Sequence, residues 1–200
     1  MNRISLKILV LLFLLVSCGK KKATYLELQK FVADPAHGLV QSKNIQGVKI
    51  DVYYRPTDLL VHQEIGKARS ASDSTIAKLR QKYSAYEYFV LSLSKGRKEI
   101  TQVEGPWDRG QIIQALSFEM SRFVKMTSMG RDSIPVSDYT IVRTFGLGNS
   151  TDALFAFEKP LGDTKWIQFS MDEFGLGIGR QEFRFSTRNI DAVPKLNFND

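Results

Sequence analysis

Cysteine and histidine are scarce in this chain of 200 residues, which has one cysteine, Cys18, and two histidines, His37 and His62. A single cysteine excludes an intrachain disulfide and any metal site built from several thiolates. A zinc site needs three or four ligands, and neither histidine belongs to a short-range ligand pattern. The sequence therefore predicts no metal site, and its fold must be held by a hydrophobic core.

Motifs for nucleotide binding and nucleophilic catalysis are also missing. Gly105 and Gly110 have the spacing of a phosphate-binding loop, but the lysine and hydroxyl residue that must follow are absent. No Gly-x-Ser-x-Gly elbow occurs. Asp172 and Glu173 are neighbours on a predicted strand, so they point to opposite faces and cannot act as one acid-base pair. We predict no catalytic residue and no cofactor, although distant carboxylates brought together by the fold stay open as an alternative.

Long hydrophobic runs are absent as well. The apolar run from Ile8 to Val16 has nine residues, whereas a membrane-spanning helix needs ~20. Arg3 and Lys7 precede the run, and a small residue, Ser17, lies between it and Cys18. This order of basic, apolar and small residues is typical of a secretory signal.

Leu15-Val16-Ser17-Cys18 resembles the lipobox of bacterial lipoproteins. The resemblance implies that residues 1–17 are a signal peptide that is removed, and that Cys18 carries the acyl chains. Several acyl chains hold a protein stably on a bilayer. The protein would thus be attached to the membrane through the lipid at Cys18. Its expected location is the cell envelope, on the outer membrane facing the periplasm. The alternative is a buried free cysteine after an ordinary secretory signal.

The net charge gives weaker information about the partners of the protein. The formal net charge is +7, and removal of the signal takes away Arg3 and Lys7. Lys20, Lys21 and Lys22 would lie beside the lipid in a short tether, residues 18–24, where basic residues are attracted to anionic head groups. The remaining charge is mildly basic, so we predict no nucleic-acid partner.

Residues 25–200 are expected to form a single α+β domain, with a largely antiparallel sheet, an early hairpin and two to three packed helices. Helical spacing of apolar residues favours helices near 25–32, 57–67, 73–83 and 109–124. The last of these is expected to bury one apolar stripe, formed by Ile113, Leu116, Met120, Phe123 and Val124. Alternation predicts the hairpin within 38–55, and a nearly continuous apolar run predicts a strand at 86–94. Further strands are expected at 138–145, 153–159, 165–172 and 180–187. Residues 34–60 also resemble uncharacterised lipoproteins of Bacteroidetes-type bacteria, a resemblance that implies no activity.

The C-terminal strands hold the candidate partner-binding surface. Glycines at alternate positions allow another backbone or a ligand to come close, or else mark a sharp turn with bulges. Outward arginines suit carboxylates or phosphates, or else form cross-strand ion pairs. The residues concerned are Gly175, Gly177, Gly179, Arg180, Arg184 and Arg188.

The predicted function is that of a lipid-anchored, non-catalytic binding or accessory module for another component of the cell envelope, such as a protein partner. Two alternatives stay open: a cell-wall or glycan hydrolase, for which a cleft with two carboxylates would be the sign, and a carrier with a large apolar cavity. The oligomeric state does not follow from the sequence.

Overall fold

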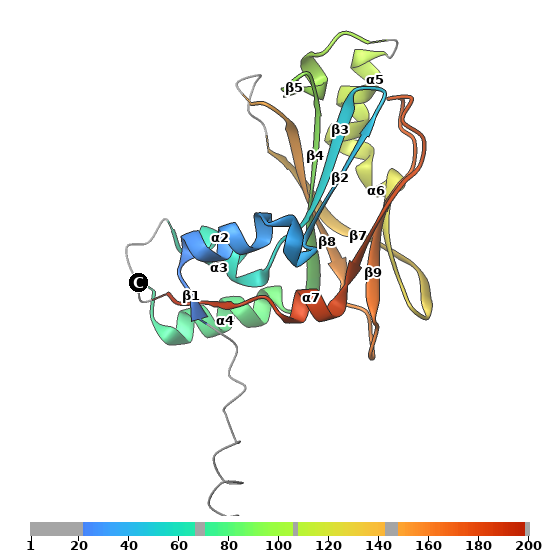
Figure 1. The fold of residues 1–200 in the computed structure, drawn as a ribbon. Helices are drawn as coiled ribbons and strands as arrows, with labels where there is room; N and C mark the ends of the chain where they lie inside the picture. The colour runs from blue at the N-terminus through green and yellow to red at the C-terminus, as the bar shows by residue number, and fades with distance from the viewer. Residues whose placement is uncertain (1–21, 67–70, 106–107, 143–147, 199–200) are drawn as a thin grey trace, which may run out of the picture.

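The computed structural model describes residues 22–66, 71–105, 108–142 and 148–198. Its main feature is a long antiparallel sheet that curls toward a barrel, with most helices at one end of it, the lower end in Figure 1. The sheet has the order β10-β9-β6-β7-β8-β4-β3-β2, and β5 pairs with β4. Its strands are β2 (Val40–Ile45), β3 (Val48–Tyr54), β4 (Tyr86–Lys95), β5 (Lys98–Glu99), β6 (Val124–Ser128), β7 (Arg131–Val142), β8 (Thr151–Glu158), β9 (Trp166–Met171) and β10 (Gln181–Ser186).

The helices begin at residues suited to cap them. Thr24 and Glu27 form a capping box at the start of α2, Ser72 accepts from the N–H of Thr75 in α4, and Asp108 accepts two N–H groups of α5. The α-helices are α2 (Tyr25–Ala33), α3 (Thr57–Ile65), α4 (Asp73–Tyr83), α5 (Arg109–Gln114), α6 (Met120–Phe123) and α7 (Thr187–Asp191), with 3₁₀ turns η2 (Pro35–His37) and η3 (Ile100–Gln102). In the described part of the chain, no helix is both long and apolar enough to cross a membrane.

A π-helical segment, η4 (Ala115–Glu119), separates α5 from α6. Its wider turn changes which side chains face the sheet, since a π turn adds a residue to the helical period. Ile112, Leu116 and Met120 are buried, whereas Ile113, expected on the apolar stripe, is 42% exposed. The helical run then ends at Phe123, and Val124 begins β6, a strand that the sequence pattern does not separate from the helix.

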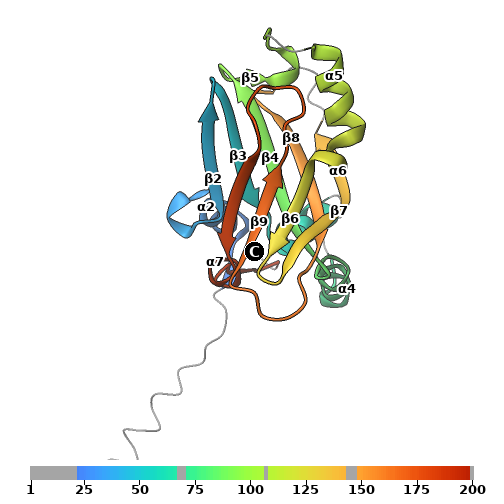
Figure 2. The same ribbon diagram turned by 90° about the vertical axis from the view of Figure 1, so that its right-hand side faces the viewer.

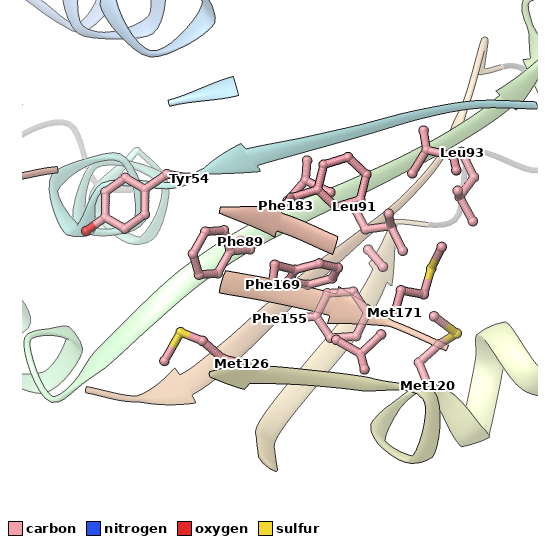
Figure 3. Packing of buried hydrophobic residues seen from close by; sticks show 14 of the residues in the cluster. Tyr54, Phe89, Leu91, Leu93, Met120, Met126, Phe155, Phe169, Met171 and Phe183 are labelled. Atoms are coloured by element: carbon pink, nitrogen blue, oxygen red, sulfur yellow. The ribbon is translucent and has the colours of Figure 1, made fainter. Parts of the chain in front are cut away.

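Phenylalanine side chains fill the interior of the curled sheet. Phe89, Phe155, Phe169 and Phe183 are fully buried, and Figure 3 shows them gathered between the strands. The rings of Phe89, Phe155 and Phe169 meet at tilted or edge-to-face angles, such as Phe155 on Phe169 at 5.6 Å between centroids. A sheet of about eight strands encloses a space just wide enough for side chains to fill, and here it is packed with aromatic rings.

The two edge strands, β2 and β10, lie close to each other on one side of the curled sheet (Figure 2), and side chains connect them. Gln41 Nε2 donates to the carbonyl oxygen of Arg184, and Lys43 Nζ donates to Gln181 Oε1 at 3.3 Å. Lys43 Nζ also lies 4.8 Å from the centroid of the Phe183 ring. These contacts cover part of the unpaired edge that an open sheet would leave exposed.

The α+β class with a mostly antiparallel sheet is confirmed, including the early hairpin. Gln46 and Gly47 both have positive φ, 53° and 81°, as the two-residue turn between β2 and β3 requires. Two details differ from expectation: the sheet closes on itself almost completely, and the described residues hold more helical segments than the two to three predicted.

The end of the expected tether is part of the domain. Lys22 and Ala23 form β1 (Lys22–Ala23), which pairs in parallel with β11 (Lys195–Leu196) near the C-terminus. The chain thus enters the domain beside the helices at the lower end of Figure 1.

Candidate ligand-binding pocket

A pocket of about 670 Å³ lies between the helix pair α3 and α4 and the outer face of strands β4, β8 and β7. Its volume falls within the range of roughly 300–1,000 Å³ that small-molecule sites occupy. The helices contribute Glu64, Lys82 and Tyr83 to its wall. We call this site the tyrosine pocket, because Tyr83, Tyr86 and Tyr88 line it together.

Strand register builds the floor of the tyrosine pocket. Ala156 of β8 lies directly opposite Tyr88 of β4 on one side and Asp138 of β7 on the other. Side chains of directly paired residues point to the same face of a sheet. Tyr88 and Asp138 are therefore two strand spacings apart, roughly 10 Å, and the small Ala156 leaves the space between them open.

Alternation along β4 separates the pocket from the core. Tyr86 and Tyr88 face the pocket, while Phe89 lies in the aromatic interior. Glu87, between the two tyrosines, is only 5% exposed; it accepts a hydrogen bond of 2.9 Å from Tyr54 Oη and lies 3.4 Å from Lys159 Nζ. The same strand thus supports the core with one set of side chains and lines the pocket with the other.

Tyr88 combines a buried ring with a free hydroxyl group. The residue is 7% exposed, and its ring meets those of Tyr83 and Tyr86 at 72° and 52°. Among the described residues its Oη has no hydrogen-bond partner. Burial first, and then the neighbouring Tyr83, Tyr86 and Glu87, raise the pKa of Tyr88 to about 12. The hydroxyl therefore stays protonated at neutral pH and can donate a hydrogen bond.

A charged cluster forms the rim. Lys82 Nζ lies 3.1 Å from each carboxylate oxygen of Glu64, and Tyr83 Oη donates to the same carboxylate. The hydrogen bonds from Tyr83 and then Lys82 lower the pKa of Glu64, and the bond to Glu64 raises the pKa of Lys82. Both groups are therefore charged at neutral pH. Asp138, on the opposite side, is exposed and has no ion pair within the described residues.

The predicted arginines lie elsewhere, and two of them already have partners. Arg180 Nε is 2.9 Å from Glu182 and 3.6 Å from Asp172. Arg184 Nε donates to Gln168 Oε1 at 3.1 Å, and its guanidinium carbon lies 4.3 Å from the Trp166 ring centroid. Arg188 is exposed on α7.

The predicted glycines form a loop between β9 and β10 that is organised around a carboxylate of the chain itself. Glu173 lies beyond the end of β9, and it accepts N–H bonds from Gly175, Gly177 and Gly179 at 2.7, 3.0 and 2.6 Å. All three glycines have positive φ, between 64° and 110°. Burial alone raises the pKa of Glu173, but these N–H bonds outweigh it and hold the pKa below its usual value.

Cys18 lies outside the described residues. No group of three or more His, Cys, Asp or Glu that could hold a metal ion occurs in the ranges that the structure describes.

Sequence reasoning missed the tyrosine pocket. The cluster of Tyr83, Tyr86 and Tyr88 within six residues was the available signal. Asp138 and Ala156 carry no such signal, because only the pairing of three strands places them next to Tyr88.

No protein-family model matches the chain. No curated protein matches its sequence. Among solved structures, the chain is similar to a DUF4426 family protein from Pseudomonas aeruginosa PAO1, with 11% identity and a TM-score of 0.37 over 72% of this chain and 92% of that one. It is also similar to a novel protein of unknown function from Burkholderia pseudomallei K96243, with 10% identity and a TM-score of 0.38 over 86% of this chain and 94% of that one. Neither similarity identifies a function for this chain.

Proposed function

We propose that this protein is a lipid-anchored, non-catalytic binding module of the cell envelope and that it binds its ligand in the tyrosine pocket. The observation that carries the proposal is the row Tyr88, Ala156 and Asp138, in which two polar groups without partners among the described residues flank a gap. A concave site with a few convergent polar groups is the usual form of a ligand site.

The proposed anchor would hold this pocket close to the membrane. Cys18 precedes Lys22 by four residues, a stretch that spans at most roughly 14 Å when extended. β1 pairs with β11, and the backbone of Leu196 in β11 bonds to Asp58 of α3 and Arg80 of α4. The helices of the pocket wall therefore lie next to the point where the anchored chain would enter the domain.

Ligand binding is favoured over hydrolysis by the charge state of Glu64. Glu64 and Asp138 both line the pocket, which is the arrangement that a glycan hydrolase with two carboxylates would need. The general acid of such an enzyme has a raised pKa, whereas the pKa of Glu64 is lowered by Tyr83 and Lys82. The lowered pKa of Glu64 counts against its acting as the general acid. The hydrolase stays the second candidate because two carboxylates line the same pocket.

The remaining alternatives receive less support. The apolar carrier would need an open apolar cavity, whereas the interior of the curled sheet is filled by phenylalanine rings. We keep the surface formed by Arg180, Arg184 and Arg188, called the arginine surface below, as a second contact for an envelope protein partner. Arg180 and Arg184 are held by contacts to Glu182 and Gln168. Arg188 is exposed on α7, and we expect it to be the arginine most available to a partner.

The test is ligand-induced stabilisation. A small-molecule extract of the cell envelope should raise the Tm of the purified full chain, because a ligand that binds only the folded state stabilises it. Ala156→Phe should abolish the rise by filling the gap between Tyr88 and Asp138, and Ala77→Phe, on the exposed face of α4, should keep it. An equal rise in both variants, or none in the wild type, would contradict binding in the pocket.

A further inference from the structure

We infer that the ligand of the tyrosine pocket is an uncharged saccharide. This inference deepens the proposed function and rests on the tyrosine pocket being the binding site. The pyranose ring of a saccharide has a face of C–H groups and an edge of hydroxyl groups. A site for it therefore needs aromatic surface beside hydrogen-bonding groups that can both donate and accept.

The aromatic surface comes from three rings that stand at angles to one another. Tyr83 and Tyr88 lie edge to face at 5.9 Å between ring centroids, and Tyr86 and Tyr88 are tilted at 6.3 Å. Tyrosine offers an apolar ring with a polar tip, so one residue can contact both a C–H face and a hydroxyl group. Rings at different angles give such contacts on more than one side of the ligand.

The hydrogen-bonding groups match hydroxyl chemistry. The Tyr88 hydroxyl is protonated, lies on a residue that is 7% exposed, and has no partner within the described part of the chain. Asp138 offers an acceptor on the far side of Ala156. A hydroxyl group of the ligand can accept a hydrogen bond from Tyr88, and a hydroxyl group can donate one to Asp138. A site with such unpaired polar groups discriminates strongly against ligands that lack the matching hydroxyls.

The charges of the rim argue against other ligand classes. Lys82 is the cation among the described residues that line the pocket, and it is already bonded to Glu64. An anionic ligand would therefore meet no unpaired cation among these residues and would face Asp138. A quaternary ammonium ligand would suit aromatic rings, but Lys82 Nζ already lies 4.9 Å from the centroid of the Tyr83 ring and would repel it. A purely apolar ligand would leave Tyr88 and Asp138 without partners.

Calorimetry on the full-length chain tests the inference, in a detergent without sugar groups such as a dimethylamine oxide. The probes are three neutral oligosaccharides, N,N′-diacetylchitobiose, maltotriose and cellotriose, with trigalacturonic acid and choline chloride for comparison. At least one neutral probe should bind. Tyr88→Phe, which removes only the hydroxyl, should weaken that binding by about tenfold, as loss of one such bond does.

Two further variants, one inside the pocket and one outside it, show whether a change in affinity is specific to the pocket. Asp138→Asn, at an exposed position, should weaken binding several-fold without affecting the fold. Tyr25→Phe is the matched control, since Tyr25 lies outside the pocket, on α2, with its hydroxyl bonded to Gln29. Its affinity should equal that of the wild type.

The outcomes separate this inference from the proposed function. Binding of only trigalacturonic acid or choline, or of no probe while the envelope extract still raises the Tm, would overturn the saccharide inference and leave the binding function standing. Failure of the extract as well as the probes would overturn both. Cleavage of a bound oligosaccharide, seen by chromatography, would favour the hydrolase over the binding module.

Discussion

Asp58 and Arg80 join the two helices of the pocket wall by a bidentate ion pair, in which Arg80 Nε and Nη2 donate to Oδ1 and Oδ2 at 2.7 and 2.8 Å. The same two side chains hold β11 in place. Asp58 accepts from the N–H of Leu196 at 2.8 Å, and Arg80 donates to its carbonyl oxygen at 3.2 Å. One pair thus connects α3, α4 and the C-terminal strand that binds β1.

Asp58→Asn should lower the free energy of unfolding by about 1–3 kcal/mol, because it removes a charge-assisted pair and weakens the bond to Leu196. Urea denaturation followed by circular dichroism measures the change. Arg122→Gln breaks the exposed pair with Glu119 and should cost at most about 0.5 kcal/mol. Equal losses in the two variants would mean that Asp58 has no special role in holding the helices.

Glu173 should make stability depend on acid pH. Its folded pKa lies below the usual value of 4.5, so the unfolded state binds its proton first as the pH falls. Its contribution is present above pH 4.5 and is lost as the pH drops through the folded pKa. Glu173→Gln should remove this part of the pH dependence in denaturation curves measured between neutral and acid pH. A slope unchanged by the substitution would contradict the role of the glycine N–H groups.

Tyr88 should make stability depend on alkaline pH: its contribution is lost as the pH rises, whereas that of Glu173 is lost as the pH falls. The usual tyrosine pKa is 10.0 and its folded pKa is about 12, so the unfolded state loses its proton first as the pH rises. The stabilisation is complete below pH 10.0 and is lost as the pH approaches 12. Comparing wild type with Tyr88→Phe isolates this contribution from those of other tyrosines. Absorbance titration should show one fewer late-titrating phenol in the variant.

Cys18→Ser should leave the protein unprocessed or soluble, because the acyl chains provide the membrane affinity. Mass spectrometry of the mature amino terminus and phase partitioning of the whole chain test this. A wild-type protein that is soluble and carries no lipid would rule out the lipoprotein proposal.

Reversal of Arg184 and Arg188 to Glu should weaken capture of an envelope protein partner if the arginine surface is a second contact. Arg188→Glu alone should leave the Tm unchanged, since the residue is exposed on α7. Arg184→Glu should lower the Tm modestly, because Arg184 lies over Trp166 and bonds to Gln168. Capture that survives a folded double variant would remove this surface from consideration.

Local patterns in the sequence determined most of the secondary structure. Alternation around Val48 to Tyr54 predicts β3, and the apolar run at 86–94 predicts β4, now seen as Tyr86–Lys95. The spacing of Ile76, Leu79 and Tyr83 predicts α4, which ends at Tyr83. These predictions succeed because side-chain period and capping depend on residues a few positions apart. Where the local period itself changed, at the π turn before Met120, the predicted apolar stripe was wrong at Ile113.

Only the tertiary structure decided the closure of the sheet and the position of the pocket. Gln41 meets Arg184, Glu64 meets Lys82, and Tyr88 shares a row with Asp138, pairs whose members lie far apart in the chain. Strand order and register bring Tyr88 and Asp138 together, whereas Glu64 meets Lys82 because α3 packs beside α4. Gln41 meets Arg184 because the curled sheet brings its two edge strands close. The period of two along a strand is the same whichever strand lies alongside, so the sequence pattern does not reveal these contacts. The sequence by itself therefore determined most of the helices and strands, and it is the basis for the proposed lipid anchor at Cys18. Long-range strand pairing and the packing of α3 and α4 against the sheet decided which of the tyrosines and carboxylates share a pocket.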